Sequence, residues 1–202
     1  MALGADYLTR EELKAYMSLE GDDQDDNVDE AISSASREIE RHCHRQFNDS
    51  EAVTTRVYKA KRCDEIAVDD FWTTDGFKLE VDTMGDGTGW TEVPASDYQL
   101  SPLNRMRDGV DWVYWKIEMV GNTSLPVSRR ACVRVTAQWG WETLPKDVKQ
   151  AVKMLASDTF QVKDSRMGVA GSDQFGTIVR VRSNSLVEAK LKHFVREKVL
   201  VA

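Results

Sequence analysis

The chain has 202 residues, of which 41% are hydrophobic and 30% are charged, and its formal net charge at pH 7 is −7. This length and composition are typical of one soluble globular domain, or of a compact domain with an insertion, and they exclude a disordered chain. The negative charge argues against a protein that grips nucleic acid over its whole surface, because such binding needs clustered lysine and arginine. A local basic patch is still compatible with these totals.

The cysteines and the hydrophobic runs indicate the kind of cellular compartment in which the protein is found. Cys43, Cys63 and Cys132 are odd in number, widely spaced and form no Cys-x-x-Cys pair. That pattern indicates reduced thiols in a cytosol-like compartment. The N-terminus has no basic stretch ahead of an apolar core, and nowhere do eighteen apolar residues run together. We therefore expect neither export nor membrane insertion.

The first predicted helix begins with a capping box. Thr9 stands at the N-cap position and Glu12 follows three residues later, so each side chain can bond the backbone of the other residue. Leu8 and Leu13 occupy the two positions of a hydrophobic staple. We expect this helix to run to about Leu19.

An acidic run precedes the second predicted helix and consists of Asp22, Asp23, Asp25, Asp26, Asp29 and Glu30. It does not match a calcium loop, because counting from Asp23 puts Val28 where the loop needs glycine and Ser34 where it needs glutamate. We interpret the run as a solvated segment that caps the helix. The helix should end near residues 47–48. Its apolar face, spaced at three and four, comprises Val28, Ile32, Ala35, Ile39 and Cys43.

A β-rich insertion follows, because the hydrophobic period becomes twofold from Thr54 onward. The candidate strands are 54–59, 65–68, 77–82, 90–93, 98–100, 112–119 and 131–139. Tight turns are predicted at Asp75-Gly76, within 85–89 and at Asp108-Gly109. Segment 112–119 has apolar residues on both faces at its start, which suggests that a partner buries one face.

The stretch 139–184 is expected to organise the rest of the chain. A helix opens at Pro145, which suits the first helical position because its missing N–H would be unpaired there anyway. Its apolar stripe comprises Val148, Ala151, Val152, Leu155, Ala156, Thr159 and Phe160. A glycine-rich loop at 166–176 and the alternating segment 177–182 follow. They predict an edge strand ordered by a neighbouring molecule, since such a strand leaves backbone donors and acceptors free.

A last helix is predicted from a second capping-box pattern, Ser185 with Glu188. Its apolar stripe comprises Val187, Leu191, Phe194 and Val195. Together the elements predict an α+β fold, a bundle of about four helices with a β-rich insertion between the second and third helices. We expect one domain over 1–202, made of N-terminal helices (1–50), the β-rich insertion (54–139) and a C-terminal part (145–202).

No motif in the sequence supports catalysis, a cofactor or a metal site. His42 and His44 flank Cys43 at a spacing that places them on different faces of a helix, so we expect Cys43 in the core rather than in a zinc site. The glycines of 85–89 precede a strand pattern and not a helix, which excludes a dinucleotide-binding turn. Thr177-Ile178 stands where a phosphate-binding loop needs lysine and serine or threonine. We therefore expect no enzyme, no cofactor and no bound metal.

The basic segment Arg180-Val181-Arg182 leaves two interpretations open. With Arg166 before it and Lys190 and Lys192 after it, it could contact DNA or an acidic protein surface. It could equally be an edge strand whose arginines are solvated. Because the arginines alternate with valines, they face one side of a strand, which fits pairing with another subunit better than reading bases.

Several stretches resemble the head-tail connector proteins of tailed phages, also called head-to-tail adaptors or head completion proteins. They are Tyr7-Leu8-Thr9-x-x-Glu12-Leu13, the acidic loop 22–26, Ile39-Glu40-Arg41, Trp139-Gly140-Trp141, Leu144-Pro145-x-Asp147-Val148, Lys163-Asp164-Ser165-Arg166-Met167-Gly168, Phe175-Gly176 and Val179-Arg180-Val181-Arg182. The resemblance covers both ends and the order of the elements, and its motifs are structural. The middle, from about residue 63 to 127, is longer than in compact members of the family.

The resemblance implies a structural virion protein that is assembled in a bacterial host cytoplasm and located at the neck. Such proteins form a closed ring of about twelve subunits beneath the portal protein. The ring extends the channel, lets genomic DNA pass without sequence-specific binding, and offers a platform for a stopper or tail-terminator protein. The contacts with the portal and with adjacent subunits would come from Arg166, Gly168, Gly171, Phe175, Gly176, Ile178, Arg180 and Arg182. Two alternatives stay open, another neck protein (stopper or tail terminator) and a small DNA-binding packaging factor.

Reversing two charges tests this expectation. A head-to-tail ring needs two complementary surfaces on each protomer, which the acidic early helices and the basic segment with Arg166 could supply. We expect the double variant Arg180→Glu, Arg182→Glu to lose ring or portal association while it stays folded. Sedimentation velocity with and without the portal measures association, and circular dichroism checks the fold. Normal assembly of the variant would refute the assignment.

Overall fold

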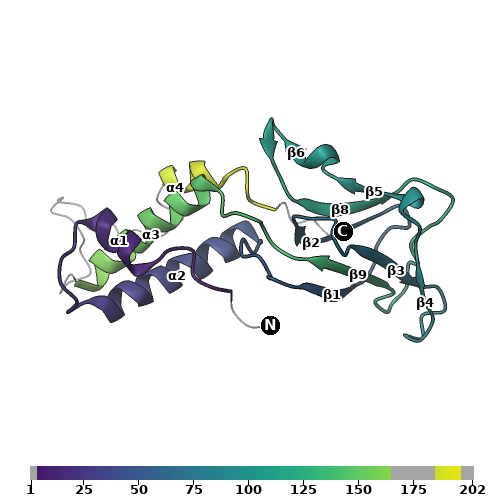
Figure 1. Cartoon of the computed structure of the whole chain (residues 1–202), viewed down its shortest axis with the longest axis horizontal. Helices are drawn as coiled ribbons and strands as arrows, with labels where there is room; N and C mark the ends of the chain where they lie inside the picture. Colours follow the sequence, from purple (N-terminus) through teal and green to yellow (C-terminus); the bar gives the residue numbers. More distant parts are fainter. Residues whose placement is uncertain (1–3, 165–184, 197–202) are drawn as a thin grey trace. The chain divides into compact units, whose positions relative to one another are not determined.

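The computed structural model describes residues 4–164 and 185–196, and the chain divides into two compact units. The helical unit comprises Met1–Gln46 and Leu144–Ala202, and the β unit comprises Phe47–Thr143. The β-rich region lies between the second and third helices along the chain (Figure 1), which confirms the predicted α+β fold class.

The described part of the helical unit contains four helices, α1 (Arg10–Met17), α2 (Asp25–Cys43), α3 (Lys146–Asp164) and α4 (Ser185–Leu191). The helices α2 and α3 pack along each other, α1 packs against both, and α4 packs against α3 (Figure 1). None of the helices in the described ranges is long and apolar enough to cross a membrane.

The ends of the helices follow local chemistry. The capping box at Thr9 and Glu12 is present in both directions, as predicted. The helix α1 ends before Leu19, because Ser18 takes a left-handed conformation with φ of 55°. In the same way His44, with φ of 52°, ends α2 at Cys43 and not near residues 47–48. The helix α3 begins one residue after Pro145, whose carbonyl accepts from Lys149 N at 2.9 Å.

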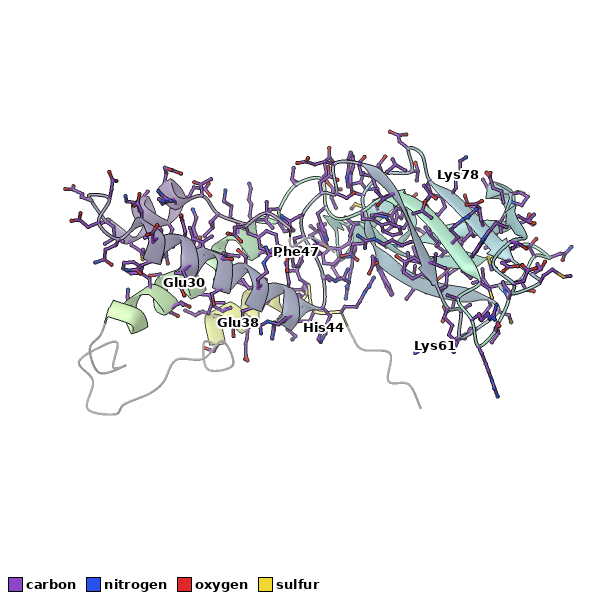
Figure 2. The ribbon with its side chains drawn as sticks, turned by 90° about the horizontal axis from the view of Figure 1, so that it is seen from below. Glu30, Glu38, His44, Phe47, Lys61 and Lys78 are labelled. Atoms are coloured by element: carbon purple, nitrogen blue, oxygen red, sulfur yellow. The ribbon has the colours of Figure 1, made fainter. Side chains whose placement is uncertain are left out.

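The predicted apolar stripes meet in the core of the helical unit. All five apolar residues predicted on α2 are buried, and the α3 stripe is buried except for Thr159, whose hydroxyl donates to Leu155 O at 2.8 Å. Burial raises the pKa of the Cys43 thiol to about 12. That thiol is therefore protonated at neutral pH and behaves as a small apolar side chain. By contrast Glu30, on the outer side of α2, is exposed to solvent (Figure 2).

The β unit contains two antiparallel sheets and a separate hairpin. The first sheet has the order β1-β9-β3-β4, with β1 (Val53–Tyr58), β9 (Val133–Gln138), β3 (Lys78–Asp82) and β4 (Trp90–Glu92). The second has the order β2-β8-β5, with β2 (Glu65–Phe71), β8 (Tyr114–Met119) and β5 (Tyr98–Ser101). The hairpin pairs β6 (Met106–Arg107) with β7 (Val110–Asp111), and two short 3-10 helices, η1 (Ala95–Asp97) and η2 (Leu103–Arg105), flank β5.

The two sheets share one core, because both contribute to the same cluster of buried side chains. The first sheet supplies Leu79, Val81, Val133, Val135 and Ala137, and the second supplies Ile66, Val68, Phe71 and Ile117. This arrangement is a two-layer packing of sheets, in which inward residues alternate with outward ones along each strand.

Each predicted segment overlaps one observed strand, although β2 extends to Phe71 and not only to residue 68. The hairpin β6–β7 was not predicted as strands, although its turn at Asp108-Gly109 was. The expectation that a partner buries the start of 112–119 is wrong, because the β unit itself buries Trp112 and Val113. Trp112 lies edge-on against Trp141, with ring centroids 5.0 Å apart.

The Trp-Gly-Trp motif closes the β unit at its base. The backbone N–H of Ser50 donates to Trp139 O at 2.8 Å, and Trp139 N donates to the Ser50 hydroxyl at 2.9 Å. Gly140 has φ of 101°, and a Cβ added there would lie 1.7 Å from the carbonyl oxygen of Asn48. Only glycine fits a position with both this dihedral angle and this contact.

Gly140→Ala should therefore destabilise the β unit strongly. The clash and the backbone strain together should lower its free energy of unfolding by at least about 3 kcal/mol. All six tryptophans lie between residues 72 and 141, so tryptophan fluorescence during urea unfolding reports this unit. The matched control is Gly109→Ala, where φ is 79° and no atom lies within 4 Å of the added Cβ. The control should lose only about 1–2 kcal/mol, and equal losses in the two variants would contradict the steric argument.

Candidate assembly surfaces

The eight residues expected to contact the portal and neighbouring subunits lie outside the part of the chain that the structure describes. They are Arg166, Gly168, Gly171, Phe175, Gly176, Ile178, Arg180 and Arg182. Their role stays a prediction. Of the flanking lysines, Lys190 lies within 3.4 Å of Asp147 on α3, whereas Lys192 is exposed.

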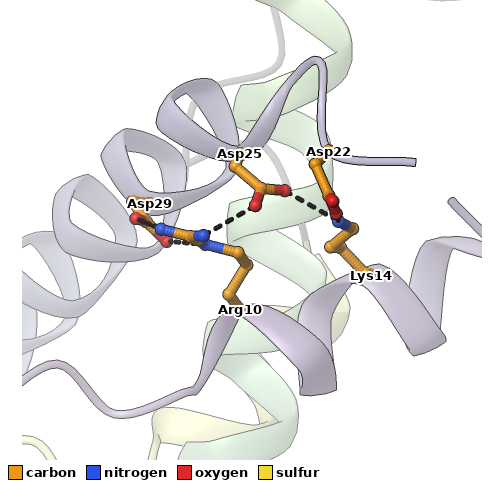
Figure 3. Close-up of polar contacts among 5 residues, drawn as sticks. All are labelled: Arg10, Lys14, Asp22, Asp25 and Asp29. Atoms are coloured by element: carbon orange, nitrogen blue, oxygen red, sulfur yellow. Dashed lines mark hydrogen bonds and ion pairs between the residues drawn. The ribbon is translucent and has the colours of Figure 1, made fainter. Parts of the chain in front are cut away.

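An ion-pair network joins α1 to the start of α2 (Figure 3). Arg10 donates from Nη1 to Asp25 at 2.6 Å and from Nε to Asp29 at 2.9 Å, and its Nη2 also donates to Asp29. Lys14 Nζ lies 2.7 Å from Asp25 and 3.1 Å from Asp22. Asp25 therefore bridges both cations of α1, and a guanidinium that engages two carboxylates fixes the orientation of the helix.

The acidic run is exposed at Asp22, Asp23, Asp26 and Glu30, as the interpretation of a solvated segment predicts, but its carboxylates also pair with α1. Three of its carboxylates hold α1, and the N-cap residue of α2, Gln24, makes no side-chain capping bond. Asp25 and Asp26 do lie in the first turn of α2, where the positive end of the helix dipole favours them. The sequence could not reveal Arg10 as the partner, because the ion pairs span up to 19 residues.

Electrostatics in the network lowers the pKa values of its carboxylates. The pKa of Asp25 is lowered chiefly because Lys14 donates a hydrogen bond to it, and also by the charge of Arg10. The pKa of Asp29 is lowered chiefly by its hydrogen bond from Arg10. Because these groups are partly exposed, solvent screens them and each pair contributes little by itself.

A second ion pair ties α1 to α3. Lys149 Nζ lies 2.5 Å from Glu12 Oε1, and this contact is the chief reason that the pKa of Glu12 is lowered. Glu12 also accepts from Thr9 N through its other oxygen, so one side chain completes the capping box and docks the helix.

Charge is divided unevenly within the helical unit. Residues 1–46 have an excess of acidic side chains, and residues 144–202 have an excess of basic ones. The pairs between Lys149 and Glu12 and between Lys14 and Asp25 use part of this charge inside the unit. The exposed Asp23 and Asp26 make no ion pair with another described residue, so the turn before α2 presents free negative charge.

The buried carboxylates of the β unit hold its loops. Asp82 accepts from the backbone N–H groups of Met84 at 3.2 Å, Gly85 at 2.9 Å and Gly87 at 2.6 Å. The glycine cluster at 85–89 is therefore a loop between β3 and β4, as predicted. Asp70 accepts from the indole N–H of Trp141 at 3.0 Å. Across residues 4–164 and 185–196, no group of three or more histidine, cysteine, aspartate or glutamate side chains could hold a metal ion.

Arg10→Met tests the network through its pH dependence. The pKa values of Asp25 and Asp29 are lowered in the folded protein, so their contribution is present above the unfolded value near 3.8 and is lost as the pH falls through the lower folded values. We expect the variant to melt a few degrees below the wild type at pH 7, and the difference to shrink at pH 3. Circular dichroism at 222 nm measures the helices. The matched control is Arg41→Met, which removes an exposed arginine of α2 whose one bond within residues 4–164 and 185–196 is to the backbone carbonyl of Arg37. A difference that stays constant with pH would contradict the electrostatic account.

Comparison with known proteins identifies relatives in fold. No protein-family model matches the chain, and no curated protein matches it either. A chain from the neck of an empty gene transfer agent (GTA) particle, computed with C6 symmetry, is 22% identical, with a TM-score of 0.58 over 97% of this chain and 93% of that chain. A chain from the virion of a native gene transfer agent particle is 20% identical, with a TM-score of 0.55 over the same shares of the two chains. A chain from the neck of a native GTA particle, computed with C12 symmetry, is 21% identical, with a TM-score of 0.50 over 100% of this chain and 98% of that chain. Over nearly its whole length, the chain thus has the fold of chains from the neck and virion of gene transfer agent particles.

Proposed function

We propose that this protein is a structural component of the neck of a tailed, phage-like particle. More specifically, it is a head-to-tail adaptor whose ring docks beneath the portal, extends the DNA channel and provides the platform for a stopper or tail protein. The observation that carries the proposal is the end-to-end likeness in fold to chains from GTA necks and virions. The sequence resemblance to head-to-tail adaptors likewise covers both ends of the chain and the order of its elements.

Rotational symmetry supports the ring. Necks computed with C6 and C12 symmetry contain the similar chains, and both symmetries are compatible with a ring of twelve copies. A closed ring of identical subunits needs two different, complementary surfaces on each copy. We assign one of them to residues 166–182, the predicted glycine-rich loop and the alternating segment after it, which would also contact the portal.

The overall charge suits a channel. With a net charge of −7, the protein repels the DNA backbone on average. A channel wall of this kind lets DNA slide, because few phosphates are neutralised and few counterions are released. The same charge argues against the alternative of a DNA-binding packaging factor.

Binding to the portal tests the proposal. The purified protein is mixed with the portal protein from the same particle and imaged by negative-stain electron microscopy. We expect a second ring stacked coaxially on one face of the portal, with a stoichiometry near one copy per portal subunit. The portal imaged alone is the control.

Two other results would point to the rival functions. Failure to bind the portal, together with binding to an assembled portal–adaptor complex or to the tail, would identify a stopper or tail terminator. Binding to duplex DNA that weakens steeply with salt, with a slope that reports several phosphate contacts, would identify a packaging factor.

A further inference from the structure

We infer that copies of this chain contact one another through the distal loops of the β unit, which dock on the acidic turn before α2 of the next copy. The distal loops are residues 59–64, 83–89 and 120–132, and the acidic turn is residues 19–26. This inference rests on the proposed neck ring, and it adds a contact between subunits that does not involve residues 166–182.

The distal loops lie together at the end of the β unit remote from the Trp-Gly-Trp motif. They lie there because β1 leads away from the base of the unit and β9, antiparallel to it, returns to that base. Leu125 N donates to Cys63 O at 2.8 Å, and Arg130 Nη1 donates to Gly85 O at 3.3 Å. A partner would therefore meet the three loops as one surface.

The distal loops are basic, although the β unit as a whole has 11 basic and 16 acidic residues. The loops contain two anions, Asp64 and Asp86, and five cations, which gives a net charge of +3. The net charge stays positive when the neighbouring Asp82 and Asp97 are counted as well. The cations are Lys59, Lys61, Arg62, Arg129 and Arg130.

Three of these cations are available to a partner. Arg62 pairs with Asp64 at 2.6 Å, so these two charges cancel. Lys59, Lys61 and Arg129 are exposed and make no ion pair with another described residue. The distal loops thus present positive charge that the fold itself does not use.

The loop 83–89 is held in one conformation and presents Met84 to solvent. The carboxylate of Asp82 is buried and accepts from three backbone N–H groups of this loop. The Met84 side chain is nevertheless 82% exposed, and Val120 and Val127 of the adjacent loop are 52% and 60% exposed. Exposed apolar side chains that lie together on ordered loops indicate a binding surface, because little conformational entropy is then lost on association.

The acidic turn carries the opposite charge. Residues 19–26 contain five carboxylates and no cation. Two of the carboxylates, Asp22 and Asp25, bond to cations of α1 (Figure 3). The other three, Glu20, Asp23 and Asp26, are exposed and make no ion pair with another described residue. They remain available to a cationic partner.

A hollow of about 130 Å³ lies between α1 and the acidic turn. Leu19 and Val28 give it an apolar part, and Glu20 and Asp23 line it with carboxylates. Its one cation, Lys14, is already bonded within the unit. Sites for drug-sized ligands start at roughly 300 Å³, so this hollow suits a single side chain of a protein partner.

Charge and shape together identify the partner as a second copy of this chain. The distal loops place the exposed Met84 among cations, and the acidic turn places an apolar hollow among carboxylates. Methionine is unbranched and flexible, which suits it to a small irregular hollow. The two surfaces differ and are complementary, as a head-to-tail contact between identical subunits requires.

DNA fits the distal loops less well than a protein does. Phosphates would pair with the cations but would leave Met84 and the two valines exposed to water. Methionine and arginine are, by contrast, both enriched where proteins meet.

A charge-swap experiment tests the contact. Lys61→Glu with Arg129→Glu makes the distal loops acidic, and Glu20→Lys with Asp23→Lys makes the acidic turn basic. We expect each double variant alone to assemble on the portal at least about tenfold more weakly than the wild type, because like charges then meet. An equimolar mixture of the two, and the chain with all four changes, should assemble again, because opposite charges are restored. The readout is the number of copies bound per portal, measured by mass photometry across a concentration series.

Matched variants separate this contact from general effects of charge. Lys78→Glu with Lys192→Glu, and Glu92→Lys with Asp111→Lys, make the same changes at exposed positions outside the two surfaces and should assemble normally. Tryptophan fluorescence checks the fold of the β unit, and circular dichroism at 222 nm checks the helices.

Met84→Ala tests the apolar part of the contact. We expect the number of bound copies at a given concentration to fall several-fold, because the hollow of the next copy loses its side chain. Met106→Ala makes the same truncation at an exposed methionine outside the distal loops and should assemble normally.

A carbodiimide cross-link shows which copies meet. This reagent joins an ammonium group to a carboxylate that contacts it, and a mixture of ¹⁴N and ¹⁵N chains separates links between copies from links within one copy. We expect mixed-isotope links from Lys59 or Lys61 to the acidic turn.

Three results would overturn the inference. They are normal assembly of either charge variant, links formed only within one copy, and a loss that neither the mixture nor the fourfold variant restores. In the last case the acidic turn pairs with another basic surface, such as residues 180–182. The portal-binding function would still stand in each case, since it is read from the wild type alone.

Discussion

The close approach of Gly140 to the backbone of Asn48 is the constraint on which the β unit depends. It brings the chain that leaves the unit against the chain that enters it, and Ser50 and Trp139 exchange hydrogen bonds across the junction. The indole of Trp139 then reaches the core, where it donates to Thr54 O at 2.9 Å and packs edge-on against Phe71. One backbone contact thus positions the side chain that fills the base of both sheets.

The buried polar groups of the described chain serve the fold. Asp82 holds a loop through three backbone donors, and Asp70 receives the indole of Trp141. In the helical unit Arg45 donates to Phe194 O at 2.8 Å. The groups that are free to contact other molecules are instead on the surface, such as the valines of β1 and the exposed aspartates before α2.

Local patterns in the sequence predicted most of the fold, because local chemistry decides where most elements begin. The capping box at Thr9, the stripes of α2 and α3 and the strands of both sheets are of this kind. What the sequence could not provide depends on residues far apart in the chain. Arg10 contacts Asp25 and Asp29 only after α1 and α2 pack together, and Trp112 contacts Trp141 only after the β unit folds.

The β6–β7 hairpin was not predicted because each of its strands has only two residues, too few to show an alternating pattern. The exposure of Val57 and Val110 likewise depends on tertiary packing, so the sequence could not predict which residues of the β unit lie on its surface. The contacts assigned to residues 166–182 stay a prediction from pattern and resemblance.

The hydrogen-bonded junction of Ser50 with Trp139 also bears on how the chain can evolve. The two ends of the β unit lie side by side, so its length and content can change without altering the distance between the points where it joins its neighbours in sequence. A segment of this kind can be gained, lost or exchanged between genomes as one piece, while the flanking helices keep their own core.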